Sequence, residues 1–79
     1  MRTLADLNLG ECGIVRQVQA SGLTRERLQD LGLVPGTRVC ASLRSPLGQP
    51  VAYEVRGSLV ALREEDARTV LLEEEATDG

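Results

Sequence analysis

Two stretches of alternating apolar and polar residues, Thr37 to Arg44 and Val51 to Arg56, constrain the fold most strongly. Successive side chains of a strand point to opposite faces, so this alternation predicts two strands that each bury one face. The connection 45–50 is rich in Pro, Gly and Ser and predicts a hairpin loop. A loop centred near Leu47 pairs each apolar position of one strand with an apolar position of the other. These pairs are Val39 with Val55, Ala41 with Tyr53, and Leu43 with Val51.

Three further short strands are predicted at Cys12 to Ala20, Ser58 to Leu62 and Thr69 to Glu73. The apolar face of the first includes Ile14 and is interrupted by Arg16. A charged residue on an apolar face predicts a β-bulge or a sheet edge at that position.

The clearest helix signal runs from Thr24 to Leu33. Thr24 is a good N-cap residue, and Gly32 suits the left-handed position that follows a last helical turn. With Gly32 at that position, Leu28 and Leu33 form the hydrophobic pair of a Schellman motif.

Short helical turns are also predicted after Thr3 and over Arg63 to Ala67. Five short strands with one apolar face each can enclose a core by curling into a barrel. We therefore expect a mainly β fold with short helices. The expected architecture is an SH3-like five-stranded small barrel with a helix in the first long connection, in a single domain 1–73. An OB-fold is the alternative, but its helix usually follows strand three, where only Gly57-Ser58 is available. The acidic segment 74–79 is expected to be a disordered tail.

Composition excludes several functions. A chain of 79 residues has a thin core and little scaffold for a deep catalytic pocket. It has no His, the commonest general base and metal ligand. A net charge of −3 and one aromatic residue argue against nucleic-acid binding. No apolar run could span a bilayer or serve as a signal peptide. We expect no enzyme activity, no nucleic-acid partner, no membrane insertion and a cytoplasmic location.

The two cysteines, Cys12 and Cys40, form no C-x-x-C pair. Small secreted domains usually carry more cysteines, so we expect reduced, structural thiols, with a disulfide or a redox role as alternatives. The hairpin register places Cys40 beside Glu54 on the outer face. Together with Cys12 and Glu11, these two residues could in principle bind iron(II) or zinc. The absence of His and of clustered thiols argues against such a site, so no metal or cofactor is expected.

Five segments share one order and spacing with a known family. They are Leu7-x-x-Gly10, Arg25-x-Arg27-Leu28-x-x-Leu31-Gly32-Leu33-x-Pro35-Gly36, Pro46-Leu47-Gly48-x-Pro50, Glu54-x-Arg56-Gly57 and Ala61-Leu62-Arg63. Over about Thr3 to Leu72 the chain resembles the ferrous iron transport protein A (FeoA) family. The resemblance implies a small cytoplasmic accessory or regulatory protein of ferrous iron uptake. Such a protein would act by protein–protein interaction with a membrane iron transporter that carries a cytosolic GTP-binding domain.

The same barrel also forms the C-terminal domain of iron- and manganese-dependent repressors. The alternative function is therefore a stand-alone SH3-like adaptor or a metal-responsive module. The sequence leaves open whether a partner is activated, inhibited or tethered. It also leaves open a homodimer formed by edge pairing.

The candidate partner-binding residues are mostly those that the predicted core does not use. They are Arg25, Arg27, Leu33, Arg44 and Leu47. Leu47 is the strongest of them, because a loop tip needs no apolar side chain and loops often carry function. We predict that the helix Thr24–Leu31 and the loop Pro46–Pro50 form one apolar groove with an arginine rim, which binds a peptide or a domain.

Overall fold

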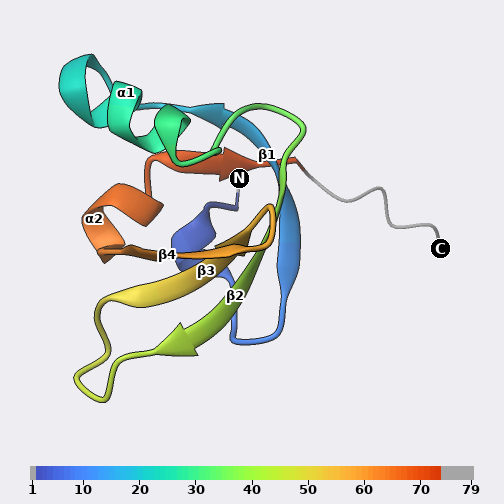
Figure 1. Ribbon diagram of the computed structural model, residues 1–79, viewed down its shortest axis with the longest axis vertical. Coiled ribbons are helices and arrows are strands. Elements are labelled where there is room, and N and C mark those ends of the chain that lie inside the picture. Colours follow the sequence, from blue (N-terminus) through green and yellow to red (C-terminus); the bar gives the residue numbers. More distant parts are fainter. Residues whose placement is uncertain (1, 74–79) are drawn as a thin grey trace, which may run out of the picture.

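The computed structural model describes residues 2–73, so the predicted tail 74–79 lies outside the described residues. Five strands form one antiparallel sheet in the order β4-β3-β2-β1-β5 (Figure 1). In chain order the elements are η1 (Leu4–Asp6), β1 (Cys12–Val18), α1 (Gly22–Asp30), β2 (Arg38–Arg44), β3 (Val51–Val55), β4 (Ser58–Leu62), α2 (Glu64–Ala67) and β5 (Val70–Leu72). This architecture confirms the predicted mainly β fold, with its helix in the first long connection.

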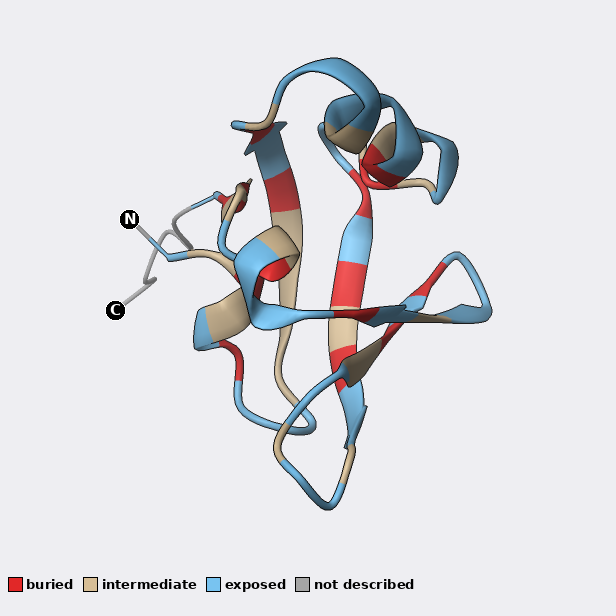
Figure 2. Cartoon of the chain, turned by 90° about the vertical axis from the view of Figure 1, so that its left-hand side faces the viewer, coloured by how far each residue is buried: buried red, intermediate tan, exposed pale blue. Residues whose placement is uncertain are grey.

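The sheet curls around a single core. Helix α1 lies at one end of the molecule and the β2–β3 loop at the other, with α2 between them (Figure 1). Buried residues alternate with more exposed ones along the strands (Figure 2), as expected for a sheet with one inner face. The buried apolar residues are Leu4, Leu7, Val15, Val18, Leu28, Leu33, Val39, Ala41, Tyr53, Val55, Leu62, Ala67, Val70 and Leu72.

The hairpin register is confirmed over its first three pairs and wrong at the fourth. The confirmed pairs are Val39 with Val55, Cys40 with Glu54, and Ala41 with Tyr53. A β-bulge then shifts the register, so that Leu43 pairs with Ala52 and Arg44 with Val51. Leu43 therefore faces outward with 59% of its surface exposed, instead of packing against Val51.

Strand β1 carries the β-bulge that Arg16 predicted, since its register with β5 shifts between Val15 and Gln17. The extra residue lets Val15 and Val18 both face the core, although their spacing does not fit a regular strand. Ile14 is only half-buried, so its assignment to the inner face was wrong.

The helix begins earlier than expected and ends as expected. Ser21 is the N-cap residue of α1, and Thr24 lies inside the first turn. At the other end Gly32 N–H donates to Gln29 O at 2.9 Å, and Leu33 N–H donates to Leu28 O at 3.1 Å. These two bonds are those of a Schellman motif. Leu28 and Leu33 are both fully buried, which confirms the predicted hydrophobic pair.

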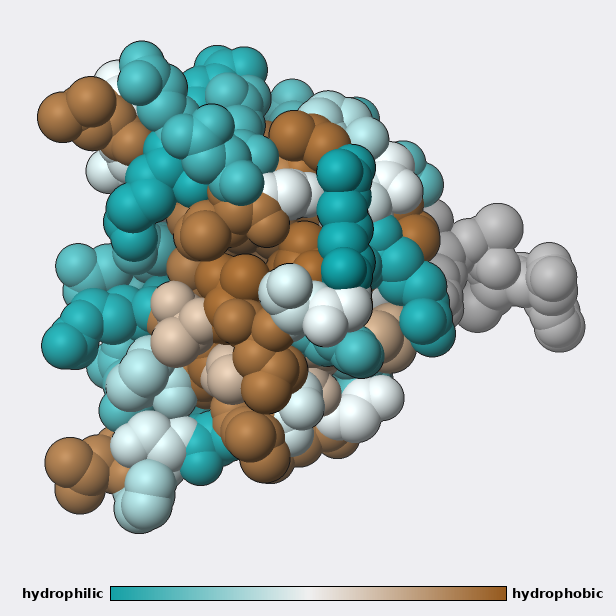
Figure 3. Space-filling model, in the orientation of Figure 1, coloured by the Kyte–Doolittle hydropathy of each residue, from teal (hydrophilic) through white to brown (hydrophobic). Residues whose placement is uncertain are grey.

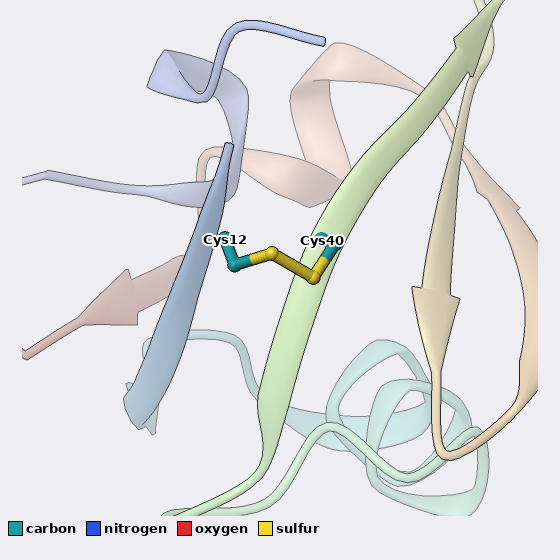
Figure 4. The surroundings of a disulfide bond; sticks show 2 residues. All are labelled: Cys12 and Cys40. Carbon is teal, nitrogen blue, oxygen red and sulfur yellow. A yellow bond between two sulfur atoms is a disulfide. The ribbon is translucent and has the colours of Figure 1, made fainter. Parts of the chain in front are cut away.

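A disulfide joins Cys12 on β1 to Cys40 on β2 (Figure 4). The expectation of reduced thiols is therefore wrong for this structure. The two residues are direct partners in the β1–β2 register, with their Cα atoms 3.9 Å apart. Sequence spacing alone could not reveal that these two strands are neighbours.

The Schellman glycine gives a test of this packing. Gly32 has a φ of +102°, and a Cβ there would lie 3.1 Å from Val55 Cγ1. A side chain in left-handed backbone costs about 1–2 kcal/mol before any crowding. We expect Gly32→Ala to lower the free energy of unfolding, measured by urea denaturation, by more than this.

Gly36→Ala is the matched control for this prediction. Gly36 has a φ of +93°, and a Cβ there would meet no atom within 4 Å, so this variant carries the backbone cost alone. Equal losses of stability in the two variants would contradict a packing role for the contact with Val55.

Candidate partner-binding surface

The β2–β3 loop presents Leu47 at the tip of a tight turn. Gly48 N–H donates to Ser45 O at 2.8 Å, and Ser45 N–H donates to Pro50 O at 3.1 Å. Pro46 stands at the second position of this turn, where its fixed φ is favoured. Leu47 is 93% exposed. The turn therefore holds an apolar side chain in water.

The loop is tied to α2 by one side chain. Gln49 Oε1 accepts a hydrogen bond from the backbone N–H of Glu64, at the start of α2, at 2.8 Å. The first N–H groups of a helix have no partner within the helix, so Gln49 fills a position that would otherwise need water. This contact fixes the loop against the body of the domain.

Beside the loop lies a small socket of about 160 Å³. Its apolar lining comes from η1, the segment that follows it, and strands β3 and β4. Arg44 and Glu64 add one charge of each sign. The lining residues are Ala5, Leu7, Arg44, Gly48, Gln49, Val51, Tyr53, Leu62 and Glu64. The socket is small, and its lining combines apolar side chains with one charge of each sign.

Tyr53 supplies a buried polar group beneath this socket. Its hydroxyl donates to Leu4 O at 3.2 Å, which links β3 to η1. Burial raises the pKa of the Tyr53 hydroxyl, the charge of Arg44 partly opposes this rise, and the charge of Glu64 adds to it. Tyr53 is therefore neutral at physiological pH and serves as a hydrogen-bond donor.

The outer face of α1 forms a second, shallower surface at the other end of the molecule. An open groove of about 450 Å³ runs along it between Leu23, which is 82% exposed, and Leu31. Figure 3 shows apolar side chains projecting at this end and at the loop end, with further apolar surface between them.

The five predicted contact residues do not come together. Arg25 and Arg27 lie on α1, whereas Arg44 and Leu47 lie at the opposite end, beside the socket. Arg27 is engaged within the domain, since its guanidinium lies 2.9 Å from the carboxylate of Asp66 on α2.

Leu33 was a wrong choice as a contact residue. It has no exposed surface, because its Schellman contact with Leu28 places it inside the core. A buried side chain cannot touch a partner without unfolding the end of α1.

The single groove predicted between the helix and the loop is also wrong. The chain enters β2 a few residues after α1 and reaches the loop only at the far end of β2. A strand of seven residues spans about 23 Å. The helix and the loop therefore lie at opposite ends of the molecule, as Figures 1 and 2 both show.

Sequence reasoning missed Leu23 and most of the socket. Leu23 precedes the predicted N-cap Thr24, so the predicted helix does not include Leu23. Ser21 was the available signal, because an N-cap there places Leu23 and Arg27 on one helical face. The socket draws on three distant segments, and local patterns do not report such a convergence.

Residues 2–73 hold no ready site for a metal. No group of three or more Cys, Asp or Glu side chains is arranged to bind a metal within this range. None of the helices described over the same residues is long and apolar enough to cross a membrane.

Five short antiparallel strands curled around one core, with a helix in the first long connection, define a small barrel of the SH3-like class. The FeoA domain model matches residues 2–74, and the chain belongs to this family.

Solved FeoA structures share the fold closely. FeoA from Chlorobium tepidum is 32% identical with a TM-score of 0.86, over 99% of this chain and 74% of that one. FeoA from Stenotrophomonas maltophilia, solved with zinc and described as an SH3 domain protein, is 31% identical. Its TM-score is 0.82 over 92% of this chain and 91% of that one. A manganese-dependent transcriptional repressor, at 17% identity and a TM-score of 0.78, shares the fold alone.

A curated relative links this sequence to a transporter. The Fe(2+) transport protein A/Fe(2+) transporter FeoB fusion protein of Porphyromonas gingivalis is 31% identical over 70 residues. These residues are 89% of this chain but only 8% of the fusion protein. The family is thus one of ferrous iron transport.

The buried hydroxyl of Tyr53 gives a test of the socket floor. Tyr53→Phe leaves Leu4 O without its donor, so we expect the free energy of unfolding at neutral pH to fall by about 1 kcal/mol. Because the pKa of Tyr53 is raised in the folded protein, its hydroxyl loses a proton in the unfolded chain at a lower pH than in the folded one. Wild-type stability should therefore fall above about pH 10, and Tyr53→Phe should lack this contribution.

Urea denaturation of both proteins from about pH 7 to pH 11 measures the difference. The difference between the free energies of unfolding of the wild type and Tyr53→Phe should become smaller above about pH 10. Parallel profiles in the two proteins would contradict a buried, neutral Tyr53.

Proposed function

We propose that this protein is an accessory protein of ferrous iron uptake that binds the membrane iron transporter and its cytosolic GTP-binding domain. The Porphyromonas gingivalis fusion carries the proposal, because there a sequence 31% identical to this one over 70 residues is joined to FeoB in one chain. Fusion raises the effective concentration of one module near another, which benefits modules that bind each other.

The β2–β3 loop and the neighbouring socket are the surface that we assign to this contact. Leu47 is apolar and fully accessible, and Gln49 holds its loop in place. A loop that is already fixed loses little conformational entropy on binding. Arg44 stands beside the socket, where it can pair with an acidic group of the partner.

The role that we propose is non-catalytic and cytoplasmic. The chain has no His, so the commonest general base is not available. A transporter's GTP-binding domain in the cytosol would require its accessory protein in the same compartment.

Leu47→Asp tests the loop. A charge at a desolvated contact position should weaken binding at least tenfold, about 1.4 kcal/mol. The melting temperature should be nearly unchanged, because the Leu47 side chain is 93% exposed and lies outside the buried core. Calorimetric titration into the GTP-binding domain of the ferrous iron transporter from the same genome measures the binding. It is run with GDP and with a non-hydrolysable GTP analogue.

Leu59→Asp is the matched control, because Leu59 is an exposed leucine on β4 that lies outside the socket lining. Leu23→Asp reports on the α1 surface. Binding lost in Leu59→Asp or Leu23→Asp but kept in Leu47→Asp would move the contact away from the loop. No heat with the wild type in either nucleotide state would contradict binding to this domain.

A further inference from the structure

Three chemically reactive side chains stand in one row across the outer face of the sheet. Cys12 on β1 is paired with Cys40 on β2, and Cys40 is in turn paired with Glu54 on β3. Side chains of directly paired residues point to the same face, with Cβ atoms about 4.5–5.5 Å apart. The fold thus brings together two sulfur atoms and one carboxylate that the sequence keeps far apart.

Two of the three residues in the row face an open cleft. Cys40 and Glu54 line an open cleft of about 580 Å³, together with residues of the α1–β2 connection and of the β3–β4 turn. Within residues 2–73 the carboxylate of Glu54 makes no hydrogen bond and no ion pair. The guanidinium of Arg56, which follows β3, donates instead to Thr37 Oγ1 at 3.5 Å. Glu54 is therefore free to bind a ligand.

The disulfide decides whether the sulfur atoms can act as ligands (Figure 4). A disulfide sulfur has no thiolate to offer, which fits the absence of a ready metal site in residues 2–73. Two thiolates and one carboxylate together suit borderline divalent cations such as zinc and iron(II). They also carry three negative charges, which exceed the two positive charges of Arg38 and Arg56 in the cleft.

We propose that reduction of the Cys12–Cys40 disulfide opens a site for one divalent d-block cation, with Cys12 Sγ, Cys40 Sγ and the Glu54 carboxylate as ligands. A dithiol reductant gives two electrons and two protons to the disulfide and becomes a disulfide itself. The cation then displaces the two thiol protons, which pass to solvent. Water from the open cleft completes a tetrahedral set.

Cobalt(II) added to the reduced protein tests the site directly, because thiolate–cobalt bonds absorb in the near ultraviolet and tetrahedral cobalt absorbs in the visible. Reductant is removed under anaerobic conditions, thiols are counted, and the fold is checked by circular dichroism before cobalt is added. We expect one cobalt per chain, both absorption bands, and displacement by zinc. The oxidised protein should show neither band.

Variants then identify the ligands. Cys40→Ser removes one of the two thiolates, so it should weaken cobalt binding and lower the near-ultraviolet absorbance per bound cobalt. Glu54→Gln should keep that band but weaken cobalt binding about tenfold or more, as expected when an oxygen ligand of a metal loses its charge. Glu65→Gln, an exposed glutamate on α2, is the matched control and should bind like the wild type.

Several results would overturn the site. They are a reduced wild type that gives no thiolate–cobalt band, and an affinity in Glu54→Gln equal to that of Glu65→Gln. A stoichiometry of two chains per cobalt would also overturn it, since that would show a bridge between molecules. None of these outcomes depends on the transporter contact.

Discussion

The fold depends on two irregularities in its longest strands. Five short strands must enclose a thin core, and regular strands of this length would leave the sheet too flat to do so. The β-bulge between Val15 and Gln17 bends β1, and the β-bulge between Ala41 and Leu43 bends β2. Both strands lie in the middle of the sheet, so each bend carries its neighbours around the core.

The bulge in β2 also builds the candidate surface. Side chains beyond the bulge point to the opposite face of the sheet from the one that a regular strand would give them. Leu43 therefore points outward, and Arg44 becomes the partner of Val51. Arg44 thereby reaches the socket beside Tyr53, where a regular strand would have placed an apolar side chain. The same irregularity that closes the barrel thus gives the socket its positive charge.

Much of the fold could be predicted from the sequence because its signals are local. The pairing of Ala41 with Tyr53 follows from alternation, and the end of α1 follows from Gly32. The bulge in β2 could not be predicted, since no charged residue marks it as Arg16 marks the one in β1. The candidate site was only partly predictable, because Leu47 is marked by its own loop whereas its neighbours in space come from distant segments.

Helix α2 is a single turn, yet it touches both ends of the molecule. Its first residue, Glu64, receives the side chain of Gln49 from the loop, and Asp66 pairs with Arg27 of α1. It therefore links the loop to α1 through one contact at each end, alongside strand β2, which separates them. A displacement of this one turn would therefore disturb the loop that carries Leu47 and the helix that carries Leu23 at the same time.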